Sequence, residues 1–189
     1  MNKGKAAEFK ELFHKYQVNV MSLLDLDEHL PDVEETGTTF TENAKLKAEE
    51  ISSILNTPVL ADDSGLIVDA LNGRPGIFSA RYAGADKSDQ ANIDKLLNEL
   101  TDVPLEKRTA RFVCVLAIAI PGQETIYRTG YCEGVISFSA LGTNGFGYDP
   151  IFIPKGYTKT MAEIPFAEKS KISHRSHALV QLKEWLESL

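Results

Sequence analysis

The chain has 189 residues, of which 43% are hydrophobic and 25% are charged. These values are ordinary for a globular protein that buries its own core. Its 27 acidic and 20 basic residues give a net charge of −7. That balance argues against a protein that coats a nucleic-acid polymer, because phosphate backbones require a basic face. Cys114 and Cys132 form no CxxC motif or Cys/His cluster, so no zinc site is expected.

The N-terminal segment and the apolar runs bear on the cellular location of the protein. Lys3 and Lys5 stand at the start with no apolar targeting segment after them, and the longest apolar run covers residues 112–120. Such a run is too short to span a membrane. We therefore expect no membrane partner and a location in the reducing cytoplasm.

Hydrophobic periodicity predicts interleaved helices and strands. Helical spacing is found over residues 5–16 and 41–56, after Ser88, and from about His174 onward. Strands are predicted over residues 18–24, 59–61 and 109–120, and residues 124–137 are predicted to pair back on the last of these as a hairpin. No repeat or linker divides the chain. We therefore expect one domain over residues 1–189, of the α/β class with a mixed sheet.

An acidic pair, Asp62-Asp63, follows the predicted strand 59–61 and precedes Ser64 and Gly65. Ligands of open α/β sheets bind beyond the carboxyl ends of strands, and Mg²⁺ prefers one or two carboxylates together with substrate phosphates. Because neighbouring strand residues point to opposite faces, only one aspartate is expected to face the cleft. The alternative is a turn in which an aspartate bonds the local backbone.

Glu42 allows two interpretations. Its spacing from Thr39 is that of a capping box, in which Glu42 satisfies the start of a helix. Alternatively, Glu42 is a second carboxylate beside a metal ion. Lys45 and Lys47 on the same helix are interpreted as part of a solvated face.

Two further segments suggest ligand contacts. Gly145 and Gly147 flank Phe146, so the backbone can approach a ligand and the ring offers a base a stacking platform. Asp149 could then accept from a base N–H, although a turn with a buried Phe146 is the alternative.

The second segment is basic. Ser173 fits a helix N-cap, which puts His174 and Arg175 in the first turn with Lys169 shortly before. Cations there oppose the helix dipole, so an anion such as phosphate is expected to compensate them. A weaker phosphate signal is the Gly4 loop with its neighbours Asn2 and Lys5.

Six segments together resemble the Ham1/RdgB-type inosine triphosphate pyrophosphatase family. They are Asn-Lys-Gly-Lys at 2–5, Thr-Phe-Thr-Glu-Asn-Ala at 39–44, Ala-Asp-Asp-Ser-Gly-Leu at 61–66, Pro-Gly-Ile-Phe-Ser-Ala-Arg-Tyr-Ala-Gly at 75–84, Gly-Phe-Gly-Tyr-Asp-Pro-Ile-Phe at 145–152 and Ile-Ser-His-Arg at 172–175. They occur in the family's order, with similar spacing, from end to end of the chain.

The resemblance implies an elongated α/β fold with a mixed sheet and two lobes around a central cleft. It also implies Mg²⁺-dependent hydrolysis of ITP, dITP and XTP to the monophosphate and pyrophosphate, by a homodimer. Asp63 would orient or deprotonate the attacking water, and Glu42 and Asp63 would hold the metal. The substrate would be bound by Asn2, Lys5, Ser64, Lys169 and Arg175 at phosphate or sugar, and by Phe146, Gly147, Tyr148, Asp149 and His174 at the base.

The family normally has a first β-strand before the Asn-Lys-Gly-Lys segment, whereas here Met1 precedes Asn2 directly. We therefore expect residues 2–5 to be loosely held. Two other functions remain open from the sequence. One is a shortened chain that binds nucleotide without turnover, and the other is a Maf-like pyrophosphatase of modified pyrimidine nucleotides.

Overall fold

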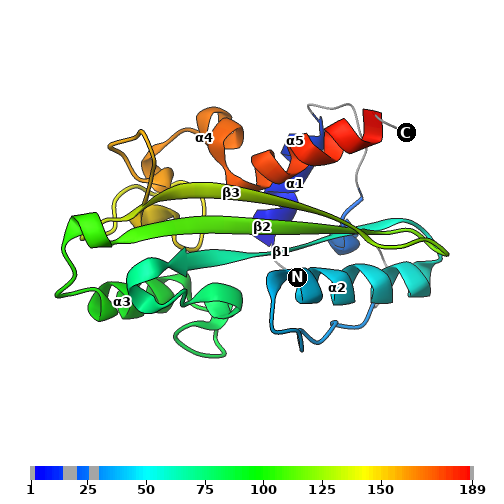
Figure 1. Ribbon diagram of the computed structural model, residues 1–189, viewed down its shortest axis with the longest axis horizontal. Coiled ribbons are helices and arrows are strands. Elements are labelled where there is room, and N and C mark those ends of the chain that lie inside the picture. Colours follow the sequence, from blue (N-terminus) through cyan, green and yellow to red (C-terminus); the bar gives the residue numbers. More distant parts are fainter. Residues whose placement is uncertain (1–2, 15–20, 26–29, 188–189) are drawn as a thin grey trace.

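A long β-sheet lies between two layers of helices in the computed structural model, which describes residues 3–14, 21–25 and 30–187 (Figure 1). The sheet order is β1-β2-β3-β4, with strands Val59–Val68, Thr109–Ala119, Ile126–Ile136 and Phe152–Pro154. All three pairings are antiparallel. The expected α/β class is therefore confirmed. We also expected a mixed sheet, but the described strands include no parallel pair.

Helices cover both faces of the sheet. On one side of the sheet lie α2 (Phe40–Leu55) and α3 (Asp89–Glu99), and on the other lie α1 (Lys3–His14), α4 (Phe166–Ile172) and α5 (His174–Glu187) (Figure 1). Short 3-10 turns connect these elements at Leu23–Asp25 (η1), Asp69–Leu71 (η2), Gly76–Arg81 (η3), Leu105–Lys107 (η4), Asp149–Ile151 (η5) and Met161–Glu163 (η6).

The central strand β2 explains this layering. Alternate side chains of a strand point to opposite faces. Val113 and Val115 accordingly pack against α2 at Ala44 and Ala48. On the other face, Cys114, Leu116 and Ile118 pack against α5. A strand buried on both faces has a nearly continuous apolar sequence, which is why the sequence predicts a strand over residues 109–120.

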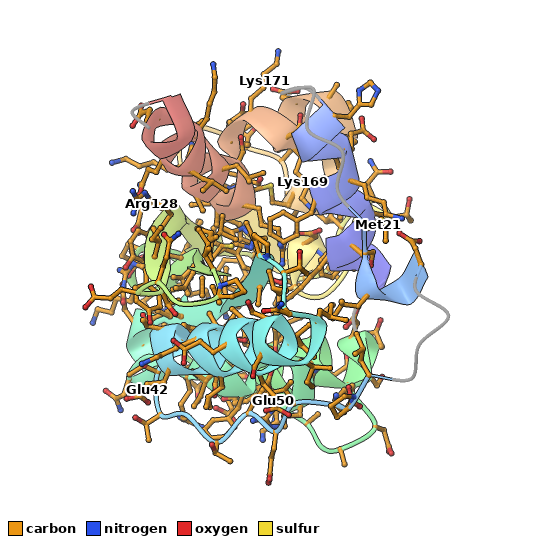
Figure 2. The ribbon with its side chains drawn as sticks, turned by 90° about the vertical axis from the view of Figure 1, so that its right-hand side faces the viewer. Met21, Glu42, Glu50, Arg128, Lys169 and Lys171 are labelled. Carbon is orange, nitrogen blue, oxygen red and sulfur yellow. The ribbon has the colours of Figure 1, made fainter. Side chains whose placement is uncertain are left out.

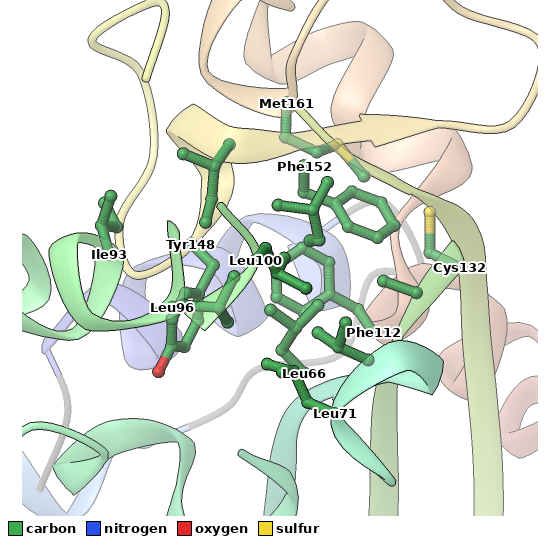
Figure 3. Packing of buried hydrophobic residues seen from close by; sticks show 14 of the residues in the cluster. Leu66, Leu71, Ile93, Leu96, Leu100, Phe112, Cys132, Tyr148, Phe152 and Met161 are labelled. Carbon is green, nitrogen blue, oxygen red and sulfur yellow. The ribbon is translucent and has the colours of Figure 1, made fainter. Parts of the chain in front are cut away.

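A third apolar cluster fills the end of the molecule beside α3 (Figure 3). Phe112 and Phe152 form its centre, with ring centroids 4.5 Å apart. Leu66 from β1, Leu96 from α3 and Tyr148 from the glycine-rich loop close around them. This packing fixes the glycine-rich loop against β2 and against β1, the strand that carries the acidic pair.

The predicted helix starts are confirmed. Thr39 and Glu42 form a capping box at α2, Ser88 accepts from the Ala91 amide at α3, and the Ser173 hydroxyl accepts from the Ser176 amide at α5. Each cap satisfies backbone donors that a helix start leaves unpaired.

Two strand predictions need correction. Of the predicted strand 18–24, residues 18–20 lie outside the described part of the chain, and Leu23–Asp25 forms a 3-10 turn. The strand predicted at 59–61 is β1, which continues through the acidic pair to Val68. Aspartate and glycine are poor strand formers. Here, however, β2 pairs with every one of these residues, so that Asp63 lies opposite Val115.

No helix within the described residues combines the length and the apolar character that crossing a membrane requires.

Gly130 of β3 allows α5 to sit directly on the sheet. A Cβ atom there would overlap the His174 carbonyl oxygen and the Ala178 backbone nitrogen. We predict that Gly130→Ala lowers the free energy of unfolding by about 1–3 kcal/mol, because the helix backbone has to move. Urea unfolding measures the loss. Hydrogen exchange should become faster in α5 and stay unchanged in α2, and an unchanged free energy of unfolding would contradict this contact.

Candidate active site

The two aspartates of β1 point to opposite faces of the sheet. Asp63 is in register with Val115, whose side chain packs against α2. Asp62 is in register with Leu116, whose side chain packs against α5. This is the alternation expected of a strand, and it gives each carboxylate its own set of partners.

Asp62 organises a charged cluster on the α5 face. Its Oδ2 atom lies 2.9 Å from Lys5 Nζ and accepts from Ser64 Oγ at 3.0 Å. Arg175 Nη2 in turn donates to Ser64 Oγ at 2.9 Å. Burial opposes ionisation of Asp62, but the cations Lys5, Arg175 and Lys47 outweigh it and lower its pKa to about 2. Asp62 is therefore a permanently charged anchor at neutral pH.

Asp63 has different surroundings on the α2 face. Lys47 Nζ lies 2.9 Å from Asp63 Oδ1 and 3.0 Å from Glu35 Oε1. Burial raises the pKa of Asp63, although Lys47 and Lys5 act in the opposite direction. Its buried Oδ2 has no hydrogen-bond partner within the described residues. A carboxylate with a raised pKa and a free oxygen is suited to accept a proton.

The two faces form one electrostatic site. Lys47 contributes to the lowered pKa of Asp62, and Lys5 acts on the pKa of Asp63. In addition, β1 is the outermost strand of the sheet among the described residues. A ligand that lies along this edge can reach groups on both faces.

The glycine-rich loop is attached to α4 by a buried ion pair. Asp149 Oδ2 lies 2.7 Å from Lys169 Nζ and also accepts from the Phe146 amide at 3.0 Å. The Lys169 and Arg175 cations each lie 5.4 Å from the Phe146 ring centre. A Cβ at Gly145 would overlap the Asp149 carboxylate. The loop therefore brings a half-buried aromatic ring beside the Ser64–Arg175 pair.

Two other residues of this loop have structural contacts. The buried Tyr148 ring packs in the apolar cluster, and its hydroxyl donates to the Ser79 carbonyl at 2.9 Å. The Gly147 amide donates to Asp89 Oδ2 at 2.7 Å. These bonds hold the loop in place, and a direct contact of either residue with substrate stays a prediction.

His174 lies buried beside the same cluster. Its ring stacks on Phe112, with centroids 4.9 Å apart. Burial, reinforced by the cations Arg175 and Lys169, keeps its pKa well below the ordinary value. The imidazole is therefore neutral, and its Nδ1 has no hydrogen-bond partner in the described part of the chain.

The structure places Glu42 in its capping box. Its Oε2 accepts from the Thr38 amide at 2.7 Å, the Thr38 hydroxyl at 2.8 Å and the Thr39 amide at 3.2 Å. Glu42 is exposed on α2, on the opposite side of the sheet from Lys169 (Figure 2). Its role as a metal ligand stays a prediction. Asn2 lies outside the described residues. Lys5 is in α1 and ion-paired with Asp62, and the loose attachment expected of residues 2–5 stays a prediction.

Sequence reasoning missed Lys47, which we interpreted as part of a solvated face. The signal was present, because Lys47 stands three residues after Ala44 and four before Ile51, on the buried side of α2. It also missed Glu35 and Arg81, whose side chains meet at 3.0 Å. No local pattern marks these two, since they are 46 residues apart.

The carboxylate oxygens of Asp63 and its neighbour Glu35 are of the kind that Mg²⁺ binds. No group of three His, Cys, Asp or Glu side chains within the described ranges is placed to hold a metal. Mg²⁺, however, usually takes only one or two carboxylates and completes its shell with water and substrate phosphates. Asp63 and Glu35 are two such carboxylates, and both lie within 3.0 Å of the Lys47 ammonium.

We predict a specific pH dependence for Asp62. Its folded pKa of about 2 lies below the ordinary value of 3.8. Its contribution to stability is therefore present above pH 4 and is lost as the pH falls toward 2. Asp62→Asn should lack this loss, which is about 2 kcal/mol. Urea unfolding of both proteins between pH 5 and pH 2 measures the difference, and parallel stability curves would contradict the prediction.

Comparisons with known proteins identify the family of this chain. The sequence matches the family model described as the Ham1 family over residues 1–185. A protein of Oceanobacillus iheyensis named dITP/XTP pyrophosphatase is 62% identical over 188 residues, which cover 100% of this chain and 95% of that protein. The solved Ham1 protein of Staphylococcus aureus has a TM-score of 0.86 and 49% identity, covering 99% of this chain and 95% of its own. The solved HAM1 protein of Coxiella burnetii has a TM-score of 0.84 and 40% identity, and the match covers 100% of this chain and 96% of that protein. Because the family model and these relatives match almost the whole sequence, the chain belongs to the Ham1 family.

Proposed function

We propose that this protein hydrolyses non-standard purine nucleoside triphosphates, namely ITP, dITP and XTP, to the monophosphate and pyrophosphate. The arrangement around β1 carries the proposal, because a proton-accepting carboxylate on one face adjoins a set of cations on the other. Hydrolysis of a triphosphate needs both a group that activates water and charges that stabilise the phosphates. The names of the close relatives point to the same reaction.

Asp63 is the base in this reaction. Lys47 holds Oδ1, so Oδ2 is the atom that accepts the proton of the attacking water. The water oxygen forms a bond to the first phosphorus of the triphosphate, the bond from that phosphorus to the bridging oxygen breaks, and pyrophosphate leaves with the electron pair. The raised pKa of Asp63 favours this transfer, because a stronger base takes the proton more readily.

Lys5 and Arg175 bind the phosphates in this proposal. Both converge on the α5 face of β1, through Asp62 and through Ser64 respectively. Their ion pairs and hydrogen bonds hold them in position before substrate arrives, so that less ordering is required on binding. Because Asp63 stands between Asp62 and Ser64 in β1, a triphosphate bound by these cations lies within reach of Asp63 as well.

Mg²⁺ would be held by Asp63, with Glu35 as the nearby carboxylate and Glu42 as the alternative that the family resemblance suggested. When bound, it neutralises charge on the transferring phosphoryl group. We also propose, from the family resemblance, a homodimer in the cytoplasm. Sedimentation of the purified protein tests the dimer.

Base selection is assigned to the Phe146 loop and His174. The Phe146 ring is the proposed stacking surface, and the Lys169 and Arg175 cations each lie 5.4 Å from its centre. The neutral His174 can donate one hydrogen bond to the oxygen of a 6-oxo purine. A 6-amino purine leaves such a donor unpaired, which penalises ATP. Pyrophosphate release from ITP, dITP and XTP, compared with ATP and a modified UTP, tests the proposed function directly.

We predict that Asp63→Asn keeps the fold and lowers the rate of ITP hydrolysis by about 10²–10⁴-fold, because an amide accepts no proton. Pyrophosphate release is the measurement. Asp62→Asn is the matched control, since it changes the neighbouring carboxylate on the other face and should be milder. Near wild-type turnover in a folded Asp63→Asn protein would refute the role of Asp63.

We predict that Arg175→Ala weakens binding of ITP far more than binding of inosine. A charge-assisted contact with phosphate is worth about 1.5–3 kcal/mol, and inosine has no phosphate. Both ligands are titrated by calorimetry into Asp63→Asn protein with and without Arg175→Ala. The Asp63→Asn change prevents hydrolysis of ITP during the measurement. Equal losses for the two ligands would place Arg175 away from the phosphates.

A further inference from the structure

The 3-10 turn η3 is seated directly on the face of β1 that carries Asp63. The Leu66 amide donates to Ser79 Oγ at 2.9 Å, and Ser79 Oγ donates to the Gly76 carbonyl at 2.6 Å. A Cβ atom at Gly65 would lie 2.5 Å from Ser79 Oγ and 2.6 Å from the Gly76 carbonyl oxygen. The glycine two residues after Asp63 therefore allows η3 to take a fixed position relative to the proposed base.

Arg81, the last residue of η3, is connected to Asp63 by alternating charges. Arg81 Nη1 lies 3.0 Å from Glu35 Oε2, and Glu35 Oε1 lies 3.0 Å from Lys47 Nζ. Lys47 Nζ then lies 2.9 Å from Asp63 Oδ1. Glu35 uses a different oxygen for each cation, so it bridges the two without competition between them.

Glu35 depends on these contacts for its position. Residues 30–39 form no helix or strand, so no regular backbone hydrogen bonding fixes this segment. Arg81 and Lys47 are the partners of the Glu35 carboxylate in the described structure. Without Arg81, the Glu35 carboxylate keeps only its contact with Lys47. The Glu35 side chain can then change rotamer, and Lys47 either moves with it or loses the contact.

We propose that Arg81 is a positioning residue for the reaction. It holds Glu35, and Glu35 directs the Lys47 ammonium onto Oδ1 of Asp63, which leaves Oδ2 aimed at the attacking water. Positioning groups of this kind keep a reactive side chain in one productive rotamer. The inference rests on the proposed hydrolysis, in which Asp63 is the base, and it gives a role to the segment 75–84 beyond folding.

Arg81→Met tests the proposal in the full-length protein. We expect kcat for ITP to fall about tenfold, the size typical of one coupled contact, with KM changed less than about twofold. Arg81→Lys should recover most of the loss, because an ammonium can still reach Glu35. Arg74→Met is the matched control, since Arg74 pairs with Glu99 at an equal 3.0 Å but has no link to Asp63. An Arg81→Met enzyme with wild-type kcat would overturn the proposal.

A double-mutant cycle shows whether Arg81 acts through Glu35. If it does, Arg81→Met combined with Glu35→Gln should have the same kcat as Glu35→Gln alone. Losses that multiply would mean that Arg81 acts by another route, such as its stacking on Phe78 at 5.3 Å, and would overturn the proposal.

A measurement independent of turnover separates this proposal from the proposed function. Lys47 is protected by its two carboxylates, so Arg81→Met should increase its acetylation by a water-soluble reagent several-fold relative to Lys45, read by mass spectrometry. Unchanged Lys47 labelling would overturn the positioning role. If the wild-type protein releases no pyrophosphate from ITP, the proposed function fails, while the labelling still decides whether Arg81 positions Lys47.

Discussion

Two consecutive carboxylates in the middle of a sheet strand impose the constraint on which the rest of this structure depends. A buried carboxylate without a partner is destabilising by several kcal/mol. Strand geometry sends Asp62 and Asp63 to opposite faces, so one cation cannot serve both directly. The α5 face provides Lys5 for Asp62, and the α2 face provides Lys47 for Asp63. These ion pairs attach α1 on one side of the sheet and α2 on the other to consecutive residues of β1.

The unequal partners make the two carboxylates chemically different. Asp62 lies near three cations, which outweigh its burial and lower its pKa to about 2. Asp63 has one ammonium on Oδ1, shares it with Glu35, and keeps an unpaired Oδ2, so burial dominates and its pKa rises. Pairs of titratable groups whose surroundings separate their pKa values divide structural and acid–base roles between them. Here the division follows from which helix faces which aspartate.

Sequence patterns predicted what depends on local periodicity and missed what depends on tertiary pairing. The helices and the strands 109–120 and 124–137 were predictable, because their apolar spacing is regular. The continuation of β1 through Asp62 and Gly65 was not, because pairing with β2 overrides poor strand propensity. The bridge between Lys47 and Glu35 joins residues 12 positions apart across an irregular segment. One indication of this contact was present in the sequence, which is that Lys47 has the spacing of the buried residues of α2.

Arg175 joins the two ends of the proposed substrate site. Its guanidinium donates to Ser64 beside Asp62, and it also lies over the Phe146 ring of the base loop. The adjacent residue, His174, stacks on Phe112 in the core, so the peptide that carries both side chains cannot shift independently of the sheet. The distance between the phosphate cations and the base platform is therefore fixed by one rigid helix start. In the proposed site, a nucleotide with the correct base would be positioned along β1 because neighbouring residues of α5 hold both ends of that site.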